Sequence, residues 1–450
     1  MLFRSAQTLA LALPAAGAVV VLARRAAVRL TAGAFVLVGL SGLILNRNLT
    51  AWMALVAGTL VPLGLRYRAR AVLPTLALLV AVGALFASAP PLRDRAVGVA
   101  RDLRAGEWDR LLSYRLGPWA AAVEMVGARA LTGWGPGTFG AEVVPHRLRA
   151  EVRFRTRLVN PHLAGSYVEA HSDYLQALAE LGVPAALAAM AAAGAVLGPL
   201  LRTAGRTGDP RAPEALVLCA LLVAGAVAAL TWFPLQRPSS AIPLLRAAGR
   251  GWRLVATTPA GRSAPGSGSR ARLAWIVVAL LALAAALGPE LLRYGAERQL
   301  QRATAGLRLH VSGAAPARRP GAVPHWVATT ARAAARHLPG DPRPLALAAA
   351  ALLVAGRTED GLAQYGEALT LGERPELMLN LGRAHALLGR TDAAQAAFLR
   401  AGWVSPAVLA WLPRPLQEAM RARIDREEAA LRAGTRTEPP PPPEGAARPG

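Results

Sequence analysis

The chain contains no lysine and only one cysteine, and both absences restrict its chemistry. All 51 basic residues in the 450-residue sequence are arginines. A Walker phosphate-binding loop is therefore excluded, because that motif uses a lysine to reach the phosphates. Cys219 has no partner for a disulfide within the chain, and its apolar surroundings indicate packing. The sequence has no H-E-x-x-H motif, no D-x-D pair and only scattered histidines, so we predict no metal site.

Acidic residues are also scarce. The 27 acidic residues leave a net charge of +24, although 54% of the chain is hydrophobic. These two properties fit together if the apolar residues form membrane spans and the charges lie between them. The arginines are scattered between apolar runs and form no basic aromatic platform, so we expect no nucleic-acid partner. The predicted fold class is all-α, a polytopic helical membrane protein.

The apolar runs predict about seven to eight spans, one of them weak. They are Ala6–Ala23, Leu30–Leu45, Thr50–Leu65, Val72–Ala89, Tyr174–Leu201, Glu214–Phe233, the weak segment Ala241–Val255 and Leu273–Gly288. The positive-inside rule places the arginine-rich turns 24–29 and 66–70 in the cytoplasm. Arg47 and the polar segment 90–173 are then expected on the outer side. The side of the C-terminal domain depends on whether Ala241–Val255 spans, which the sequence leaves open, and the periplasmic side is the preferred prediction.

The C-terminal part changes character and contains a repeat. Gly356-Arg357-Thr358 recurs as Gly389-Arg390-Thr391, 33 residues later, each between two helical patterns. Ala346–Leu369 and Leu379–Ala401 therefore resemble tetratricopeptide repeats, which suggests a protein partner. The predicted domains are four transmembrane helices in 1–89, an outer loop in 90–173, further transmembrane helices in 174–289 with a cytoplasmic linker in 246–272, a helical connector in 290–340, repeats in 341–412, and a helix with a disordered proline-rich tail in 413–450.

His171 is the candidate catalytic residue. It belongs to a polar cluster, Glu169 to Asp173, that runs directly into the predicted span Tyr174–Leu201. Imidazole is the side chain most easily used as a base near neutral pH, and a titratable group at the entrance to a span favours a functional role. Tyr174, three residues further on, is expected to share a helical face with His171. For Asp173 the preferred interpretation is a helix cap.

Two arginines are candidates for binding a diphosphate. Arg47 and Arg115 are both expected on the outer side, as is His171, and fixed guanidinium groups can stabilise a diphosphate without a metal. A further arginine series lies at 147, 149, 153, 155 and 157, and we expect most of these side chains to face solvent or lipid headgroups.

A glycine-rich segment, GPGTFG at Gly135–Gly140, matches the G-x-G-x-x-G pattern. A helical pattern precedes it and no βαβ unit follows, so a dinucleotide-binding fold is rejected. The segment is interpreted as a turn that ends a helix. Gly135 and Gly137 could still offer backbone N–H groups to a phosphate, as supporting residues.

Four segments resemble the O-antigen ligase and polymerase superfamily over residues 30–245. They are R-x-x-x-W (Arg115 to Trp119), GWGPGTF (Gly133–Phe139), HSDYLQALAELGVPA (His171–Ala185) and WFPLQRP (Trp232–Pro238). The resemblance implies a metal-independent, cofactor-free glycosyltransferase of the bacterial inner membrane that uses an undecaprenyl-diphosphate-linked glycan as donor. It also implies that arginines of a periplasmic loop hold the diphosphate while a histidine activates the acceptor. These roles fall on Arg115, more loosely Arg47, and His171.

The acceptor remains open at this point. Lipid A-core would make the protein a ligase in lipopolysaccharide assembly, a growing chain would make it a repeat-unit polymerase, and a protein would make it an O-oligosaccharyltransferase. The alternative from another class is a non-catalytic membrane scaffold that displays the repeats. Family members usually have several more spans before the region of Arg47, so an in-frame extension upstream of Met1 is expected if the chain is truncated. Glycan identity and oligomeric state are not predicted.

Overall fold

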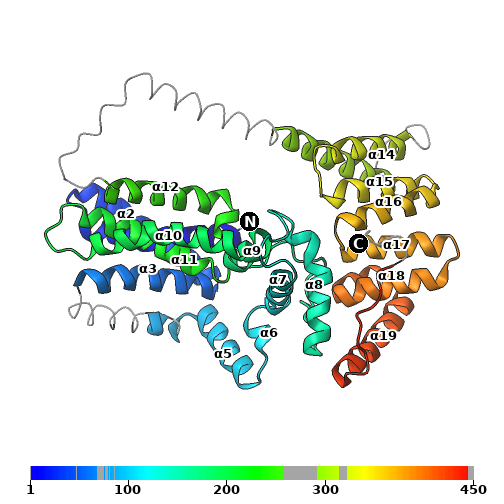
Figure 1. Ribbon diagram of the computed structural model, residues 1–450, viewed down its shortest axis with the longest axis horizontal. Helices are drawn as coiled ribbons and strands as arrows, with labels where there is room; N and C mark the ends of the chain where they lie inside the picture. The colour runs from blue at the N-terminus through cyan, green and yellow to red at the C-terminus, as the bar shows by residue number, and fades with distance from the viewer. Residues whose placement is uncertain are drawn as a thin grey trace. The chain divides into compact units, whose positions relative to one another are not determined.

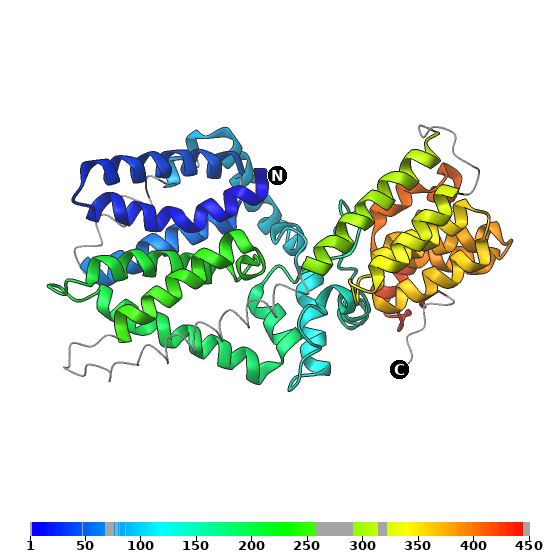
Figure 2. The same ribbon diagram turned by 90° about the horizontal axis from the view of Figure 1, so that it is seen from above.

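Helices make up all the regular structure in the described part of the chain, which confirms the predicted all-α class. The computed structural model describes residues 2–46, 48–67, 76, 80, 82–85, 87–256, 291–313 and 322–443. Arg47, the predicted span Leu273–Gly288 and half of the predicted span Val72–Ala89 lie outside these residues. The chain divides into unit 1, residues 1–139 and 169–259, and unit 2, residues 140–168 and 260–450 (Figures 1 and 2).

Unit 1 is a bundle of mostly apolar helices. Its elements are α1 (Leu2–Leu22), α2 (Ala26–Asn46), α3 (Leu49–Tyr67), α5 (Pro90–Arg104), α6 (Trp108–Leu111), α7 (Leu116–Ala128), α9 (Asp173–Leu181), α10 (Val183–Ala204), α11 (Ala212–Ala228), the 3₁₀ turn η2 (Pro234–Gln236) and α12 (Pro238–Ala256). Helix α11 contacts α1, α3, α10 and α12, so it forms the centre of the bundle. Gly58 on α3 allows close packing, because a Cβ atom there would lie 2.7 Å from the Ala220 carbonyl oxygen of α11.

Among the described residues of unit 1, three helices are long and apolar enough to cross a membrane, in agreement with the predicted membrane protein. They are Ala26–Leu45 in α2, Leu49–Tyr67 (α3) and Val183–Ala204 (α10), while Leu11–Leu22 and Ala212–Ala228 are shorter apolar helices. The prediction of one continuous span over Tyr174–Leu201 was wrong. Gly182, with φ 79° and ψ 163°, ends α9, and α10 then begins with Pro184 in its first turn.

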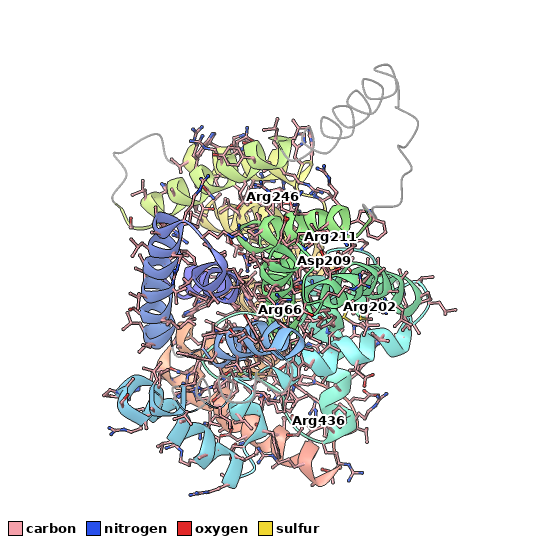
Figure 3. The ribbon with its side chains drawn as sticks, turned by 90° about the vertical axis from the view of Figure 1, so that its left-hand side faces the viewer. Arg66, Arg202, Asp209, Arg211, Arg246 and Arg436 are labelled. Atoms are coloured by element: carbon pink, nitrogen blue, oxygen red, sulfur yellow. The ribbon has the colours of Figure 1, made fainter. Side chains whose placement is uncertain are left out.

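Arginines gather at one end of the unit 1 bundle. Arg66, at the end of α3, donates a 2.7 Å hydrogen bond to the carbonyl oxygen of Arg206, just after α10. Figure 3 looks onto this end and labels Arg66, Arg202, Asp209 and Arg211 there. At the other end of α3, Thr50 Oγ1 lies 2.6 Å from Thr231 Oγ1, just after α11. The turn around Thr231 and the arginine cluster therefore lie at opposite ends of α3.

Unit 2 combines a helix of the central loop with the C-terminal helices. Its elements are α8 (Phe139–Phe154), a helix over residues 291–311, α14 (Ala322–Ala335), α15 (Pro342–Val354), α16 (Thr358–Leu371), α17 (Pro375–Leu387), α18 (Thr391–Val404), the 3₁₀ turn η3 (Pro406–Trp411) and α19 (Arg414–Ala433). Helices α15 and α17 begin 33 residues apart, as do α16 and α18, and each pair has equal lengths. The sequence repeat therefore corresponds to two helical hairpins.

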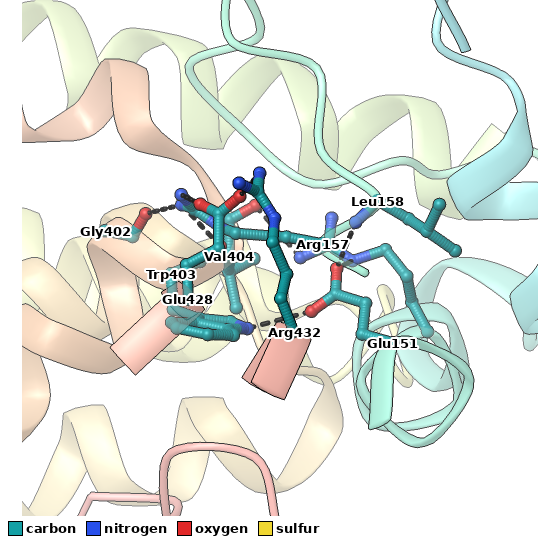
Figure 4. A network of polar contacts seen from close by, with 9 residues as sticks. Glu151, Arg157, Leu158, Gly402, Trp403, Val404, Glu428 and Arg432 are labelled. Atoms are coloured by element: carbon teal, nitrogen blue, oxygen red, sulfur yellow. Dashed lines mark hydrogen bonds and ion pairs between the residues drawn. The ribbon is translucent and has the colours of Figure 1, made fainter. Parts of the chain in front are cut away.

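Two arginines, Arg147 of α8 and Arg157 just after it, donate hydrogen bonds to the carbonyl groups at the end of α18. The sequence did not indicate this role. The final carbonyl groups of a helix lack partners within it. Arg157 donates to the Gly402 and Trp403 carbonyl oxygens at 2.6 and 3.0 Å, and Arg147 donates to that of Val404 at 3.0 Å (Figure 4). Most of the series was expected to face solvent or lipid headgroups, and Arg149, Arg153 and Arg155 are indeed exposed. Arg147 is instead buried, and only 7% of the Arg157 side chain is exposed.

Glu151 completes this buried network. Its carboxylate pairs with Arg147 at 3.2 Å and accepts a 2.8 Å hydrogen bond from Trp403 Nε1 (Figure 4). The described part of the proline-rich tail also packs on unit 2, since Arg400 donates to the carbonyl of the buried Pro440. The loop segment and the C-terminal helices thus share one folded core.

Candidate active site

His171 lies in a turn, before the first residue of helix α9. Its φ of 54° is in the left-handed region, which few residues other than glycine adopt, so the surrounding contacts must hold it there. Ser172 is the N-cap, and its hydroxyl accepts from the Leu175 N–H at 3.4 Å. The predicted helical face shared by His171 and Tyr174 is therefore wrong. The Tyr174 hydroxyl instead donates to the Ala226 carbonyl of α11 at 2.9 Å.

Asp173 fastens the WFPLQRP turn to α9. Its carboxylate accepts a 2.9 Å hydrogen bond from the Leu235 N–H and a 3.0 Å bond from Gln236 Nε2. The interpretation of Asp173 as a cap is thus wrong, because Ser172 fills that position. The start of α9 and the WFPLQRP turn, more than 60 residues apart in the sequence, are therefore held together beside His171.

The glycine-rich turn holds an anion that belongs to the chain itself. The backbone N–H groups of Gly137 and Phe139 donate to the two carboxylate oxygens of Glu180, at 2.9 and 3.1 Å. Gly135 N–H donates to the Glu180 carbonyl at 2.9 Å. The N–H groups suggested for phosphate at Gly135 and Gly137 are therefore already used. Gly133 needs to be glycine, because φ is 65° and a Cβ would lie 2.3 Å from the Glu180 carbonyl oxygen.

Gln176 connects Glu180 to the backbone next to His171. Its Nε2 donates to Glu180 at 3.0 Å, while its Oε1 accepts from the Ala170 N–H at 3.0 Å. Gln236 Nε2 donates to the same Oε1 at 3.0 Å. One network, buried at Asp173, Gln176 and Glu180 and exposed at Gln236, thus joins the glycine-rich turn, α9 and the WFPLQRP turn. Because buried amides and carboxylates are costly to leave unpaired, this network fixes the position of the His171 turn.

The electrostatic environment of His171 favours its neutral form. Burial is the main cause, followed by the positive charges of Arg115 and Arg237, and together they lower the pKa of His171 to about 4. The imidazole and Phe233 rings lie 5.3 Å apart between centroids. At neutral pH the ring is therefore uncharged and has a nitrogen that can accept a proton.

Arg115 lies at the start of α7 and acts on His171 through its charge. The two residues before it, Ser113 and Tyr114, both have left-handed backbones, with φ of 56° and 59°. Such strained conformations often cluster at functional sites. Of the three residues predicted for the chemistry, the structure thus relates Arg115 to His171. Arg47 lies outside the described residues.

Arg237 is the charged group that the sequence reasoning missed. Its guanidinium lies 4.8 Å from the Phe233 ring centroid and pairs with Glu169 at 3.0 Å. Glu169 also had no predicted role. Arg237 belongs to the WFPLQRP segment, whereas Glu169 lies two residues before the segment that begins at His171. The spacing of 68 residues between them hides their pairing in the sequence.

Residues 33–190 match the family model described as O-antigen ligase. Over these residues the chain is similar to the O-antigen ligase superfamily. No curated protein and no solved structure matched the chain. This similarity, together with the apolar helices, suggests a membrane enzyme of the ligase or glycosyltransferase type that acts in surface polysaccharide assembly.

The matched region includes Arg115, His171, Gln176 and Glu180, whereas Gln236 and Arg237 lie beyond it. Next to His171 in the sequence, Asp173 and Tyr174 line an apolar cavity of about 300 Å³. Its other walls are mostly small and aliphatic side chains from α10, α11 and α12, including Ala189 and Leu244. Within the described residues, no group of three or more histidine, cysteine, aspartate or glutamate side chains is arranged to hold a metal ion.

Proposed function

We propose that this protein transfers a glycan from an undecaprenyl-diphosphate donor to an acceptor hydroxyl, as an O-antigen ligase does in lipopolysaccharide or surface polysaccharide assembly. The observation that carries the proposal is a neutral, half-buried His171 under the influence of Arg115, inside the region that matches the O-antigen ligase family. A neutral imidazole is suited to take a proton, and a guanidinium is suited to bind phosphate.

In the proposed reaction, the acceptor oxygen attacks the anomeric carbon of the donor sugar. The bond from that carbon to the phosphate oxygen breaks, and undecaprenyl diphosphate leaves with the electron pair. A ring nitrogen of His171 takes the acceptor proton. Arg115 and Arg47 neutralise the charge that develops on the leaving diphosphate. The chain's own residues then supply both the base and the electrostatic stabilisation.

Donor binding would also change the pKa of the proposed base, His171. The charges of Arg115 and Arg237 contribute to the low pKa of His171. A bound diphosphate would compensate these charges, so the pKa of His171 would rise towards the working pH. A base works best when its pKa lies near that pH. The histidine would therefore become a more effective base only when the donor is in place.

The apolar cavity beside the site suits part of the polyprenyl chain. Its walls are almost entirely hydrocarbon and include α10, one of the helices able to cross a membrane. A lipid-linked donor must keep its chain in an apolar environment while its diphosphate reaches the polar end of the protein. We therefore assign the first isoprene units of the donor to this cavity.

The protein is proposed to reside in the bacterial inner membrane with His171 on the periplasmic side. The arginine cluster of Arg66, Arg202 and Arg211 would face the cytoplasm, according to the positive-inside rule. The contacts of Arg147 and Arg157 support a periplasmic C-terminal domain, because a bilayer cannot separate two segments of one folded core.

This topology can be tested with single cysteines in a Cys219→Ser background. Arg153→Cys on α8 and Arg414→Cys on α19 replace exposed side chains, and Arg206→Cys marks the arginine end. In cells with a permeable outer membrane, an impermeant maleimide should label the first two sites. Arg206→Cys should react only after the inner membrane is opened. Labelling of Arg153→Cys without Arg414→Cys would show that the two segments lie on different sides.

The function itself is tested by the surface polysaccharide of a deletion strain complemented with wild-type or His171→Ala protein. A ligase defect removes long chains from lipid A-core, a polymerase defect leaves single repeat units, and a protein-transferase defect removes protein glycans. The proposal expects one of these losses with His171→Ala at normal protein level in the membrane. Normal glycans with His171→Ala, but not after deletion of residues 341–412, would favour the scaffold alternative.

A further inference from the structure

Arg237 is the second cation that acts on His171, and it is held by two neighbours. Its guanidinium pairs with Glu169 at 3.0 Å and lies over the Phe233 ring, which also packs against the His171 imidazole. The side chains of Arg237 and Glu169 keep 32% and 22% of their surface exposed. The ion pair therefore lies at the open surface of the site, where an incoming anion can reach it.

The backbone that carries Arg237 is fixed before any substrate arrives. Asp173 accepts hydrogen bonds from Leu235 and Gln236, the two preceding residues. The Ser240 hydroxyl donates to the carbonyl oxygens of Pro234 and Arg237, at 2.7 and 3.1 Å. A guanidinium on a rigid turn and over an aromatic ring loses little freedom when it binds a ligand. This arrangement is typical of a preorganised anion-binding group.

We propose that Arg237 binds the diphosphate of the lipid-linked donor and that the Glu169 carboxylate occupies its guanidinium until the diphosphate displaces it. The inference rests on the proposed function for the identity of the donor. A diphosphate carries more charge than a carboxylate and offers several oxygens to the guanidinium fork, so the exchange is favourable. Glu169 keeps Arg237 oriented in the empty site and competes weakly with the donor.

A purely structural ion pair predicts a different pattern of mutant effects. If Arg237 and Glu169 only stabilised the turn, removing either charge would break the same interaction and weaken the site to the same extent. If Arg237 binds the donor, the two substitutions act in opposite directions. Loss of the guanidinium weakens donor binding, whereas loss of the competing carboxylate strengthens it.

The test is the affinity of the full-length protein in detergent for undecaprenyl diphosphate, compared with undecaprenyl monophosphate. We expect Arg237→Gln to weaken diphosphate binding about tenfold or more, as for loss of a charged hydrogen bond. Arg237→Lys should restore part of it, and Glu169→Gln should tighten binding severalfold. Arg250→Gln and Glu214→Gln, which break another ion pair of unit 1, should leave it unchanged. Thermal unfolding confirms that each variant is folded.

Unchanged binding by folded Arg237→Gln would overturn this inference, and so would equal weakening by Glu169→Gln and Arg237→Gln. Both outcomes leave the proposed transfer reaction intact, because His171 and Arg115 do not enter the comparison. A wild-type protein that does not prefer the diphosphate lipid would count against the donor itself, and therefore against the proposed function and this inference together.

Discussion

The Glu180 carboxylate accepts a 2.9 Å hydrogen bond from the backbone N–H of Gly137. This contact joins the GWGPGTF segment to the helix that follows His171. Through Gln176, the same carboxylate is linked to the backbone N–H of Ala170, immediately before His171. The glycine-rich turn thus binds the side chain of Glu180. We expect it to influence catalysis by fixing the position of His171.

Glu180→Gln tests this positioning role. The amide keeps one acceptor oxygen but presents an NH₂ group to a backbone donor, so at least one buried hydrogen bond is lost. We expect the free energy of unfolding to fall by about 1–3 kcal/mol and kcat for transfer to fall, with donor affinity nearly unchanged. The exposed Glu107→Gln is the control. Thermal unfolding and steady-state kinetics measure the two effects, and wild-type stability and kcat together would refute the role.

The pH dependence of transfer follows from the pKa of His171. A pKa of about 4 instead of 6.5 means that the base stays neutral down to mildly acidic pH, so kcat/KM for the donor should fall only near pH 4. The acidic decrease in kcat should occur at a higher pH than that in kcat/KM, because bound diphosphate compensates the positive charges of the arginines. In Arg115→Gln the decrease in kcat/KM should occur at a higher pH than in the wild type. An unchanged pH of this decrease would show that the charge of Arg115 does not influence His171.

The same shift sets the pH dependence of stability. The folded-state pKa lies below the unfolded one, so the unfolded chain binds more protons between about pH 4 and 6.5. The contribution of His171 to stability therefore decreases as the pH falls through this window and is constant above it.

The sequence predicted the elements better than their contacts. The apolar runs indicated α2 and α3, and the 33-residue repeat indicated two similar helical hairpins. The break at Gly182 also had a signal, since a glycine followed by Pro184 favours the end of one helix and the start of another. Local patterns of this kind are visible in a single segment of chain.

The contacts that build the site come from segments distant in the sequence. Nothing near Arg237 indicates that it meets Glu169, and nothing near Glu180 indicates that backbone N–H groups surround it. Arg157 belongs to a series of five arginines, most of which were expected to be solvated, yet the end of α18 offers it unpaired carbonyl groups. Tertiary packing decides each of these cases.

Arg157→Ala tests the joint folding of the loop segment with the C-terminal helices. The substitution leaves the Gly402 and Trp403 carbonyl oxygens without a buried donor, and Glu428 loses a 3.3 Å partner. We expect a loss of about 1–3 kcal/mol in the unfolding free energy of unit 2 and faster proteolysis after α18. The exposed Arg153→Ala should change neither measurement. Equal behaviour of the two variants would show that the buried network contributes little.

Ala189→Trp tests the apolar cavity as the site of the polyprenyl chain. The indole would fill space now bounded by α10, α11 and α12, so KM for the lipid-linked donor should rise about tenfold or more while the protein remains folded. Ala188→Trp, on the neighbouring exposed position outside the cavity, is the matched control. An unchanged KM in the cavity variant would place the lipid chain elsewhere.

The most direct test of the account is the rate of glycan transfer by purified His171→Ala protein with an undecaprenyl-diphosphate-linked glycan and its acceptor. The exposed His162→Ala is the control from the same loop. Loss of a general base predicts a decrease of about a hundredfold to ten-thousandfold in His171→Ala, with donor affinity retained. His162→Ala should transfer at the wild-type rate. A His171→Ala protein that transfers glycan as fast as the wild type would contradict the assignment of His171 as the base.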